Sequence, residues 1–152
     1  MSFSLHLREG VLYSYGDKNY APINARFFAG GGSTLRGYDY RAVGPRADTF
    51  RVVNGVVSVS DEAVGGEMRF LQSFEVKYRL TDILRLYGFV DSGAVFFKPE
   101  DFDFGDFKFS TGLGLGIDVP FLGPIRVDYG IPLNPNDDQG KGQLHLQSSV
   151  KF

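Results

Sequence analysis

The sequence predicts an all-β protein, an antiparallel segment of a transmembrane β-barrel with about six strands of a larger barrel. Apolar and polar residues alternate with a period of two in six segments, and helical periodicity is almost absent. Each segment has about nine to fourteen residues, whereas globular strands usually have about five or six and a tilted membrane-spanning strand needs about nine to eleven. Long and short connections alternate between the segments, which is typical of outer-membrane barrels.

The first two segments occupy residues 3–15 and 67–80. The first starts within the opening residues, as a chain cut inside a strand would. Its apolar residues are Phe3, Leu5, Leu7, Val11, Tyr13 and Tyr15. Those of the second are Met68, Phe70, Phe74, Val76, Tyr78 and Leu80. The positions between them are polar, charged or small, and they include Glu75. We therefore expect one face of each strand to contact lipid and the other to face the barrel interior.

Four further segments repeat the alternation, at residues 84–96, 107–119, 125–133 and 144–152. Their apolar residues again share one face, and charged, hydroxyl-bearing or glycine residues occupy the other. Asp91, Arg126, Asp128, Gly130 and His145 all belong to the polar faces. A soluble β-sandwich also alternates, so the length of the segments and the order of the connections favour the membrane barrel.

The connections differ systematically in length. Three are long, at residues 17–66, 98–106 and 134–142, and they alternate with short turns near Thr81 and at residues 120–124. If the chain ends on the periplasmic side, this order places all three long connections outside the cell. The longest contains "VVNGVV" at residues 52–57, where Asn-Gly between valines predicts a two-residue hairpin.

Composition excludes several classes of function. The net charge is −2 and the basic residues are scattered, so we predict no nucleic-acid partner. Without cysteine there is neither a disulfide framework nor a thiolate metal site. No run of eighteen apolar residues predicts a membrane-spanning helix.

The stretch "RFFAGGGSTLRGYDYRAVGP", residues 26–45, suggests a phosphate-binding loop at first sight. A P-loop requires Lys and Ser or Thr after its last glycine, but Tyr38 and Asp39 occupy these positions. "DFG" at residues 103–105 has no other kinase element beside it, and the Asn and Asp residues at 134–138 lack the glycine and the closing Glu of a calcium loop. We predict no enzymatic activity, no cofactor and no metal, and we interpret His6 and His145 as polar residues of the barrel interior or of the membrane interface.

The same loop resembles the sixth extracellular loop of the BamA/TamA superfamily of outer-membrane assembly and translocation barrels. The resemblance centres on Leu35-Arg36-Gly37-Tyr38 with its "RFFAGG" lead-in. "GFVDSGAVF" at residues 88–96 and "GPIRVDYGIPL" at residues 123–133 resemble later strands of the family, and the chain ends on Phe152, like the terminal strand signal of such barrels. The motifs follow the family order over essentially the whole chain.

The resemblance implies a role for the loop arginine. In the family this loop enters the barrel lumen, and its arginine pairs with carboxylates of the wall. Carried over by position, Arg36 would contact Glu75 and Asp91, both of which the alternation places on the polar face. A guanidinium can bond two carboxylates in a partly dehydrated site, so we expect a loop latch. The alternative is a solvated arginine in an ordinary turn.

The resemblance also implies a function and a location. Residues 1–152 would be the C-terminal part of a sixteen-stranded barrel in the outer membrane of a Gram-negative bacterium, without its N-terminal strands and periplasmic POTRA domains. Its expected partners are outer-membrane lipid, the remaining barrel strands or further copies of itself, and client outer-membrane proteins. Clients would pair at a lateral seam by β-augmentation, where Ser148 and Ser149 make either a weak seam or a frayed end.

Three alternative functions remain open at this point. The chain could belong to a passive pore or adhesin barrel, which would not need the latch. It could belong to the barrel of a patatin-like or two-partner secretion protein. A soluble ligand-binding β-barrel would stay in solution without detergent.

Overall fold

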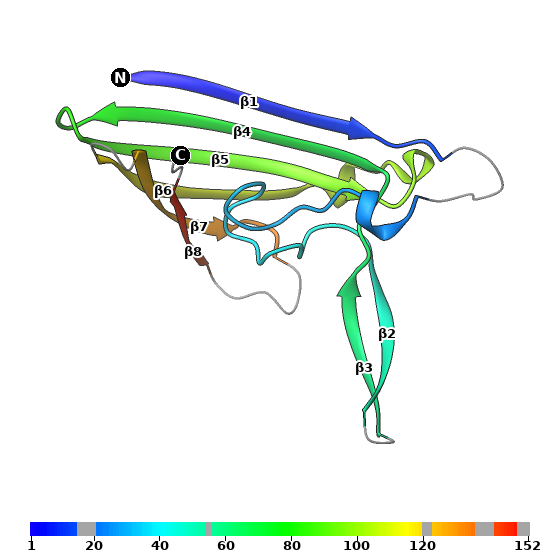
Figure 1. The fold of residues 1–152 in the computed structure, drawn as a ribbon. Coiled ribbons are helices and arrows are strands. Elements are labelled where there is room, and N and C mark those ends of the chain that lie inside the picture. The colour runs from blue at the N-terminus through cyan, green and yellow to red at the C-terminus, as the bar shows by residue number, and fades with distance from the viewer. Residues whose placement is uncertain (15–20, 54–55, 120–122, 136–141, 149–152) are drawn as a thin grey trace.

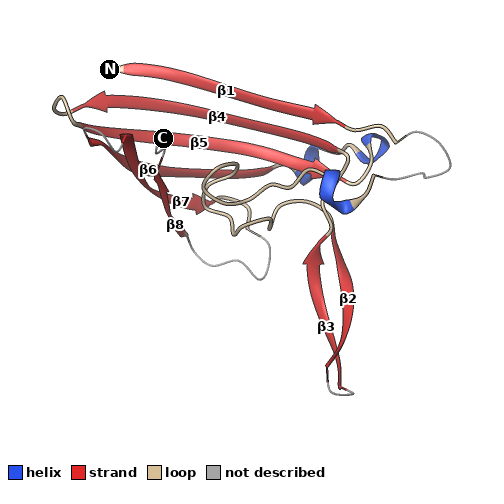
Figure 2. Cartoon of the chain, in the orientation of Figure 1, coloured by secondary structure: helices blue, strands red, loops and turns tan. Residues whose placement is uncertain are grey.

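The structure is a computed structural model, which describes residues 1–14, 21–53, 56–119, 123–135 and 142–148. These residues form two antiparallel β-sheets and three short 3-10 helices (Figure 2). None of the helices in these ranges has the length and apolar character to cross a membrane.

Six strands form the main sheet, in the order β1-β4-β5-β6-β7-β8 (Figure 1). Their bounds are Ser2–Val11 for β1, Met68–Arg79 for β4, Leu84–Phe96 for β5, Lys108–Val119 for β6, Gly123–Pro132 for β7 and Gln143–Ser148 for β8. Every neighbouring pair is antiparallel. The predicted fold class is confirmed: the six alternating segments are six strands of an open, partial barrel.

The ends of the outermost strands differ from the prediction. β1 stops at Val11, four residues before the predicted end of the first segment. The last segment was predicted to run through residue 152, but residues 149–152, Phe152 among them, lie outside the described residues. The terminal strand signal is therefore not observed.

Alternation gives the main sheet two chemically different faces. On the outer face Leu5 of β1 is 63% exposed and Leu146 of β8 is 73% exposed. On the inner face Glu75, Asp91 and Asp128 are buried. A row of exposed large apolar side chains over buried carboxylates is the reverse of a soluble protein and suits a sheet whose outer face contacts hydrocarbon.

Cysteine labelling tests this assignment of the faces on β1. Cysteine at position 5 or 7, on the outer face, should resist an aqueous maleimide in detergent micelles, whereas cysteine at position 6, on the inner face, should react. The sequence contains no cysteine of its own, so each introduced thiol reports one position. Equal labelling at all three positions would contradict the lipid-facing assignment.

The described parts of the connections after β1 and β5 lie at one end of the sheet, and the turn between β4 and β5 lies at the other (Figure 1). The connection after β5 contains helices η2 (Pro99–Asp101) and η3 (Phe104–Asp106). Its Phe102 ring lies 5.1 Å from the ring of Phe96 and 5.7 Å from that of Phe70, measured between centroids. Phe96, which the alternation assigns to the lipid-facing side, is consequently covered by this connection and only 2% exposed.

The connection between β1 and β4 lies across the inner face of the sheet (Figure 1). After helix η1 (Ile23–Ala25), residues 26–45 fold back on themselves and bury an apolar cluster against the wall. This cluster contains Ala29, Leu35, Tyr38, Val43, Leu71 and Val95. The two strands of the predicted hairpin are present as β2 (Arg46–Val53) and β3 (Val56–Ala63), which project away from the sheet. The predicted turn at residues 54–55 lies outside the described residues. The loop therefore occupies the space that the sheet encloses.

Candidate functional site

The loop residues before Arg36 form a compact turn that presents its side chain to the wall. Gly30 and Gly31 have φ angles of 109° and 94°, which glycine adopts without steric cost. The Thr34 hydroxyl accepts a hydrogen bond from the Gly30 amide at 3.0 Å and donates one to the Gly30 carbonyl at 2.9 Å. Gly31 N donates to Tyr38 O at 3.0 Å. These bonds close the turn and fix the direction of Arg36.

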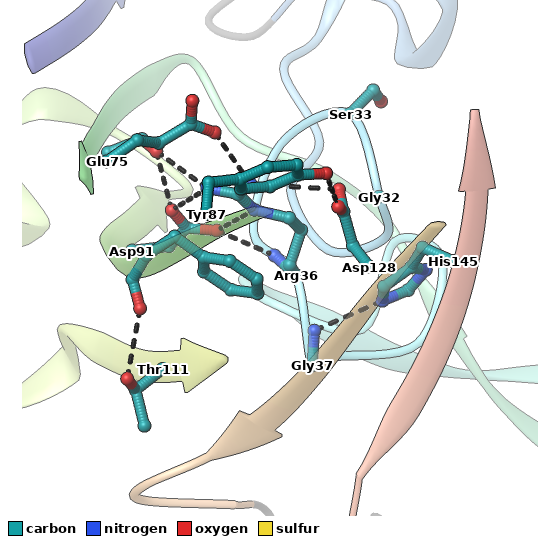
Figure 3. A network of polar contacts seen from close by, with 12 residues as sticks. Gly32, Ser33, Arg36, Gly37, Glu75, Tyr87, Asp91, Thr111, Asp128 and His145 are labelled. Carbon is teal, nitrogen blue, oxygen red and sulfur yellow. Dashed lines mark hydrogen bonds and ion pairs between the residues drawn. The ribbon is translucent and has the colours of Figure 1, made fainter. Parts of the chain in front are cut away.

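Arg36 makes a two-pronged contact with Asp91 of β5 (Figure 3). Its Nε and Nη2 donate to the two carboxylate oxygens at 2.7 and 2.6 Å. Nη1 donates to Glu75 Oε1 at 2.8 Å, and Nη2 also reaches Ser73 Oγ at 2.9 Å. The guanidinium carbon lies 3.6 Å from the centroid of the Phe89 ring. The planar guanidinium is thus bonded at its edge and stacked on its face.

All three charged groups of this contact are buried. Arg36 is 5% exposed, Glu75 3% and Asp91 1%. Burial by itself disfavours the guanidinium charge, but the hydrogen bonds and charges of Asp91 and Glu75 outweigh it and raise the pKa of Arg36 above its ordinary value. The arginine is therefore held charged, between two buried carboxylates.

The cluster extends to β7. Arg126 donates from Nη2 to Glu75 Oε1 at 2.8 Å and from Nε to the Tyr87 hydroxyl at 2.8 Å. That hydroxyl donates in turn to Asp128, whose other oxygen lies 3.7 Å from a nitrogen of Arg36 and 3.7 Å from one of Arg126. Asp128 is completely buried, so its charge depends on these neighbours.

Formal charges balance within the cluster. Its carboxylates are Glu75, Asp91 and Asp128, and its cations are Arg36, Arg126 and Lys77, which lies 2.9 Å from Glu75. One of the three cations comes from the loop and the other five groups come from the wall. Removing the loop would leave the wall with an unmatched negative charge.

The structure brings together three of the residues that the sequence singled out, Arg36, Glu75 and Asp91. It also shows contacts that the sequence analysis missed, to Ser73, Tyr87, Arg126 and Asp128. All four belong to the inner face, where the period of two places them. That period does not say which residues of neighbouring strands lie opposite each other, so the cluster could not be assembled from it.

Gly37 and Tyr38 contact different parts of the wall. Gly37, with a φ of 87°, lies so close to Gly130 of β7 that a Cβ on Gly130 would be 2.5 Å from Gly37 N. The Gly37 amide donates to His145 Nε2 at 3.1 Å. Tyr38 is completely buried, and its hydroxyl lies within 3.0 Å of Phe109 O and Asn134 Oδ1.

Tyr38 should make stability depend on pH in the alkaline range. Burial raises the pKa of its hydroxyl above the ordinary value of 10.0, and the hydrogen bonds to Asn134 and Phe109 oppose this only in part. The folded state favours the neutral phenol, so its contribution is complete below about pH 10 and declines as the pH rises through the higher folded pKa. Tyr38→Phe should cost about 1–2 kcal/mol at neutral pH. In urea titrations the difference from wild type should shrink above about pH 10, and a constant difference would contradict this.

The two histidines have different surroundings. His145 accepts the hydrogen bond from Gly37, whereas His6 lines a polar cavity of about 250 Å³ between the loop and the sheet, together with Arg8, Gln147, Arg36, Glu75 and Asp91. In the described part of the chain, no three His, Cys, Asp or Glu side chains are grouped as ligands of a metal ion. The buried charge cluster therefore holds residues 26–45 against the inner face of the main sheet.

Comparison with known proteins identifies the family of this chain and finds a solved structure with a similar fold. A model of the Omp85 superfamily domain matches residues 1–152. Outer membrane protein assembly factor BamA of Nitratidesulfovibrio vulgaris is 30% identical over 141 residues, which are 91% of this chain and 16% of that protein. The crystal structure of BamA from Haemophilus ducreyi lacking POTRA domains 1–3 resembles the fold with a TM-score of 0.75 at 21% identity. The match covers 95% of this chain and 30% of the chain in that crystal structure.

Proposed function

This chain belongs to the Omp85 superfamily, and from that premise we propose that it forms part of an outer-membrane barrel that assembles, inserts or translocates proteins. The resemblance inferred from the loop and strand motifs is confirmed at the level of the family. The chain spans about a sixth of the length of the assembly factor that it matches, 16%. The activity of a complete protein is therefore part of the proposal.

The buried charge cluster supports this proposal most directly. Arg36, Glu75 and Asp91, which we call the latch, hold residues 26–45 against the inner face through hydrogen bonds of 2.6–2.8 Å. A loop fixed in this way fills space that a passive pore would keep open. Burying four charged groups, Arg36, Glu75, Asp91 and Asp128, is costly unless the geometry is good, so a latch of this kind suits a barrel whose interior must hold a defined conformation.

The edges of the sheet support a lateral route for clients. In the described residues β1 pairs only with β4, and β8 pairs only with β7. Backbone groups at an open edge cost several kcal/mol each in hydrocarbon, so the folded barrel must contain further strands beside both edges. Those strands come from the rest of a longer chain or from another copy. Where the first strand of such a barrel approaches β8, its last strand, an incoming strand can pair by β-augmentation.

A reconstitution experiment tests the proposal. The full-length protein that carries this chain is inserted into liposomes, and the folding of a urea-denatured client barrel is followed by the shift in its gel mobility. We expect faster client folding than in protein-free liposomes, and a reduced rate with Arg36→Lys. Conductance without any effect on client folding would favour the passive pore. Release of a secreted partner without barrel insertion would favour a two-partner secretion protein.

A further inference from the structure

β8 is the edge strand on one side of the sheet. It pairs with β7 over six positions, from Ile125 opposite Ser148 to Gly130 opposite Gln143. On its outer face Leu144 and Leu146 are exposed, and its inner face carries His145 and Gln147. Among the described residues the strand has no neighbour on its other side. Its position therefore depends on β7 and on whatever contacts its inner face.

The loop tip contacts that inner face at two points. The Gly37 amide donates to His145 Nε2 at 3.1 Å (Figure 3), which requires that this nitrogen carry no proton. Gln147 Nε2 donates to the carbonyl oxygen of Gly32. A Cβ placed on Gly32 would lie 3.0 Å from the Cβ of His145, so the loop backbone packs directly against the strand.

The same loop tip is also bonded to β4 and β5, which are separated from β8 by β6 and β7. Arg36 lies one residue before Gly37 and is bonded to Glu75 on β4 and Asp91 on β5. The order of strands places β6 and β7 between β5 and β8. The loop therefore bridges β5 and β8 across the inner face, in parallel with the backbone ladder.

We propose that the loop tip tethers the edge strand β8 through His145 and Gln147, and so positions it for the strand pairing described above. This inference rests on the proposed function, because it identifies residues that position the strand at the seam. Inner-face side chains of a strand point perpendicular to the sheet. The tether therefore uses none of the backbone groups at the free edge, and these stay available to a partner strand while β8 is held in place.

Hydrogen exchange of residues 143–148 in the full-length protein tests the tether. Loss of one hydrogen bond in Gln147→Ala or His145→Phe should accelerate exchange in β8 by about threefold to tenfold. His145→Gln should restore slow exchange, because its side-chain oxygen can accept in place of Nε2. Leu144→Ala, on the outer face of the same strand, serves as the matched control and should leave the exchange unchanged. Unaltered exchange in both variants, or equal acceleration in β4 and β5, would overturn the proposal.

A cysteine pair tests the same contact without removing a wall contact of Arg36. The Cβ atoms of a Gly32→Cys, His145→Cys variant would lie 3.0 Å apart, slightly closer than the roughly 3.5–4.5 Å of disulfides. Oxidation should cross-link loop and strand after a small shift, and exchange in β8 should then fall below the wild-type rate until a reductant is added. Failure to cross-link, or an oxidised form in which β8 exchanges as in wild type, would refute the tether. Client folding is measured in parallel, and its absence with slow exchange intact would count against the proposed function alone.

Discussion

Replacing Arg36 by alanine is expected to release residues 26–45 from the wall and to lower the free energy of unfolding by about 3–5 kcal/mol. The variant removes one cation from a balanced cluster and leaves Glu75, Asp91 and Asp128 facing only Arg126 and Lys77. Asp91 and Asp128 are 1% and 0% exposed, so both carboxylates lie in the interior when they lose this partner. The cost is that of an uncompensated buried charge, which exceeds the value of the bonds themselves.

The measurement combines urea unfolding of the full-length protein in detergent with limited proteolysis of the loop. Arg36→Lys should recover only part of the stability, because an ammonium cannot bond both oxygens of Asp91 and Glu75 in one plane. Arg46→Ala is the matched control, since its ion pair with Asp61 has side chains 36% and 48% exposed. Such a pair contributes at most about 1 kcal/mol. Equal protease resistance of the loop in Arg36→Ala and wild type would show that the latch does not hold it.

The sequence allowed the faces of the strands to be predicted, but only part of the cluster. A period of two places Glu75, Asp91, Arg126 and Asp128 on one side of the sheet, and the structure agrees. The contact of Arg36 with Glu75 and Asp91 came from the family resemblance. Periodicity is a property of one strand at a time, so it could not show that the cluster also includes β7.

Register explains the missing contacts. A tight turn after β4 pairs Arg79 with Arg85, and counting back along both strands sets Ser73 opposite Asp91. The Ser73 hydroxyl consequently donates to Asp91 at 2.6 Å. Phe96 shows a different limit: its face was predicted from alternation, but its burial depends on how the connection after β5 folds. The composition of a single strand predicts neither the register nor that packing.

Replacing Gly130 by alanine is expected to displace the loop without removing any charge. The new Cβ would lie 2.5 Å from Gly37 N and 2.9 Å from the carbonyl carbon of Arg36. Both are backbone atoms, and Gly37 is already held at a φ of 87°, so neither can move aside by a change of rotamer. The loop must lift from β7, which lengthens the bonds of Arg36. We expect a loss of about 3 kcal/mol, at the upper end of the cost of overpacking.

Gly116→Ala on β6 is the control for the glycine itself. A Cβ there would meet Arg85 O and the Tyr87 ring at 3.8 Å, an ordinary van der Waals contact, so stability should stay within about 0.5 kcal/mol of wild type. Protease sensitivity of residues 26–45 should rise in Gly130→Ala and not in Gly116→Ala. If Gly130→Ala keeps a protected loop, close packing on β7 is not needed to hold Arg36 in the cluster, and charge pairing alone fixes the loop. If the loop is released although every carboxylate and cation remains, pairing is insufficient, and the latch requires the backbone of Gly37 to lie directly on β7.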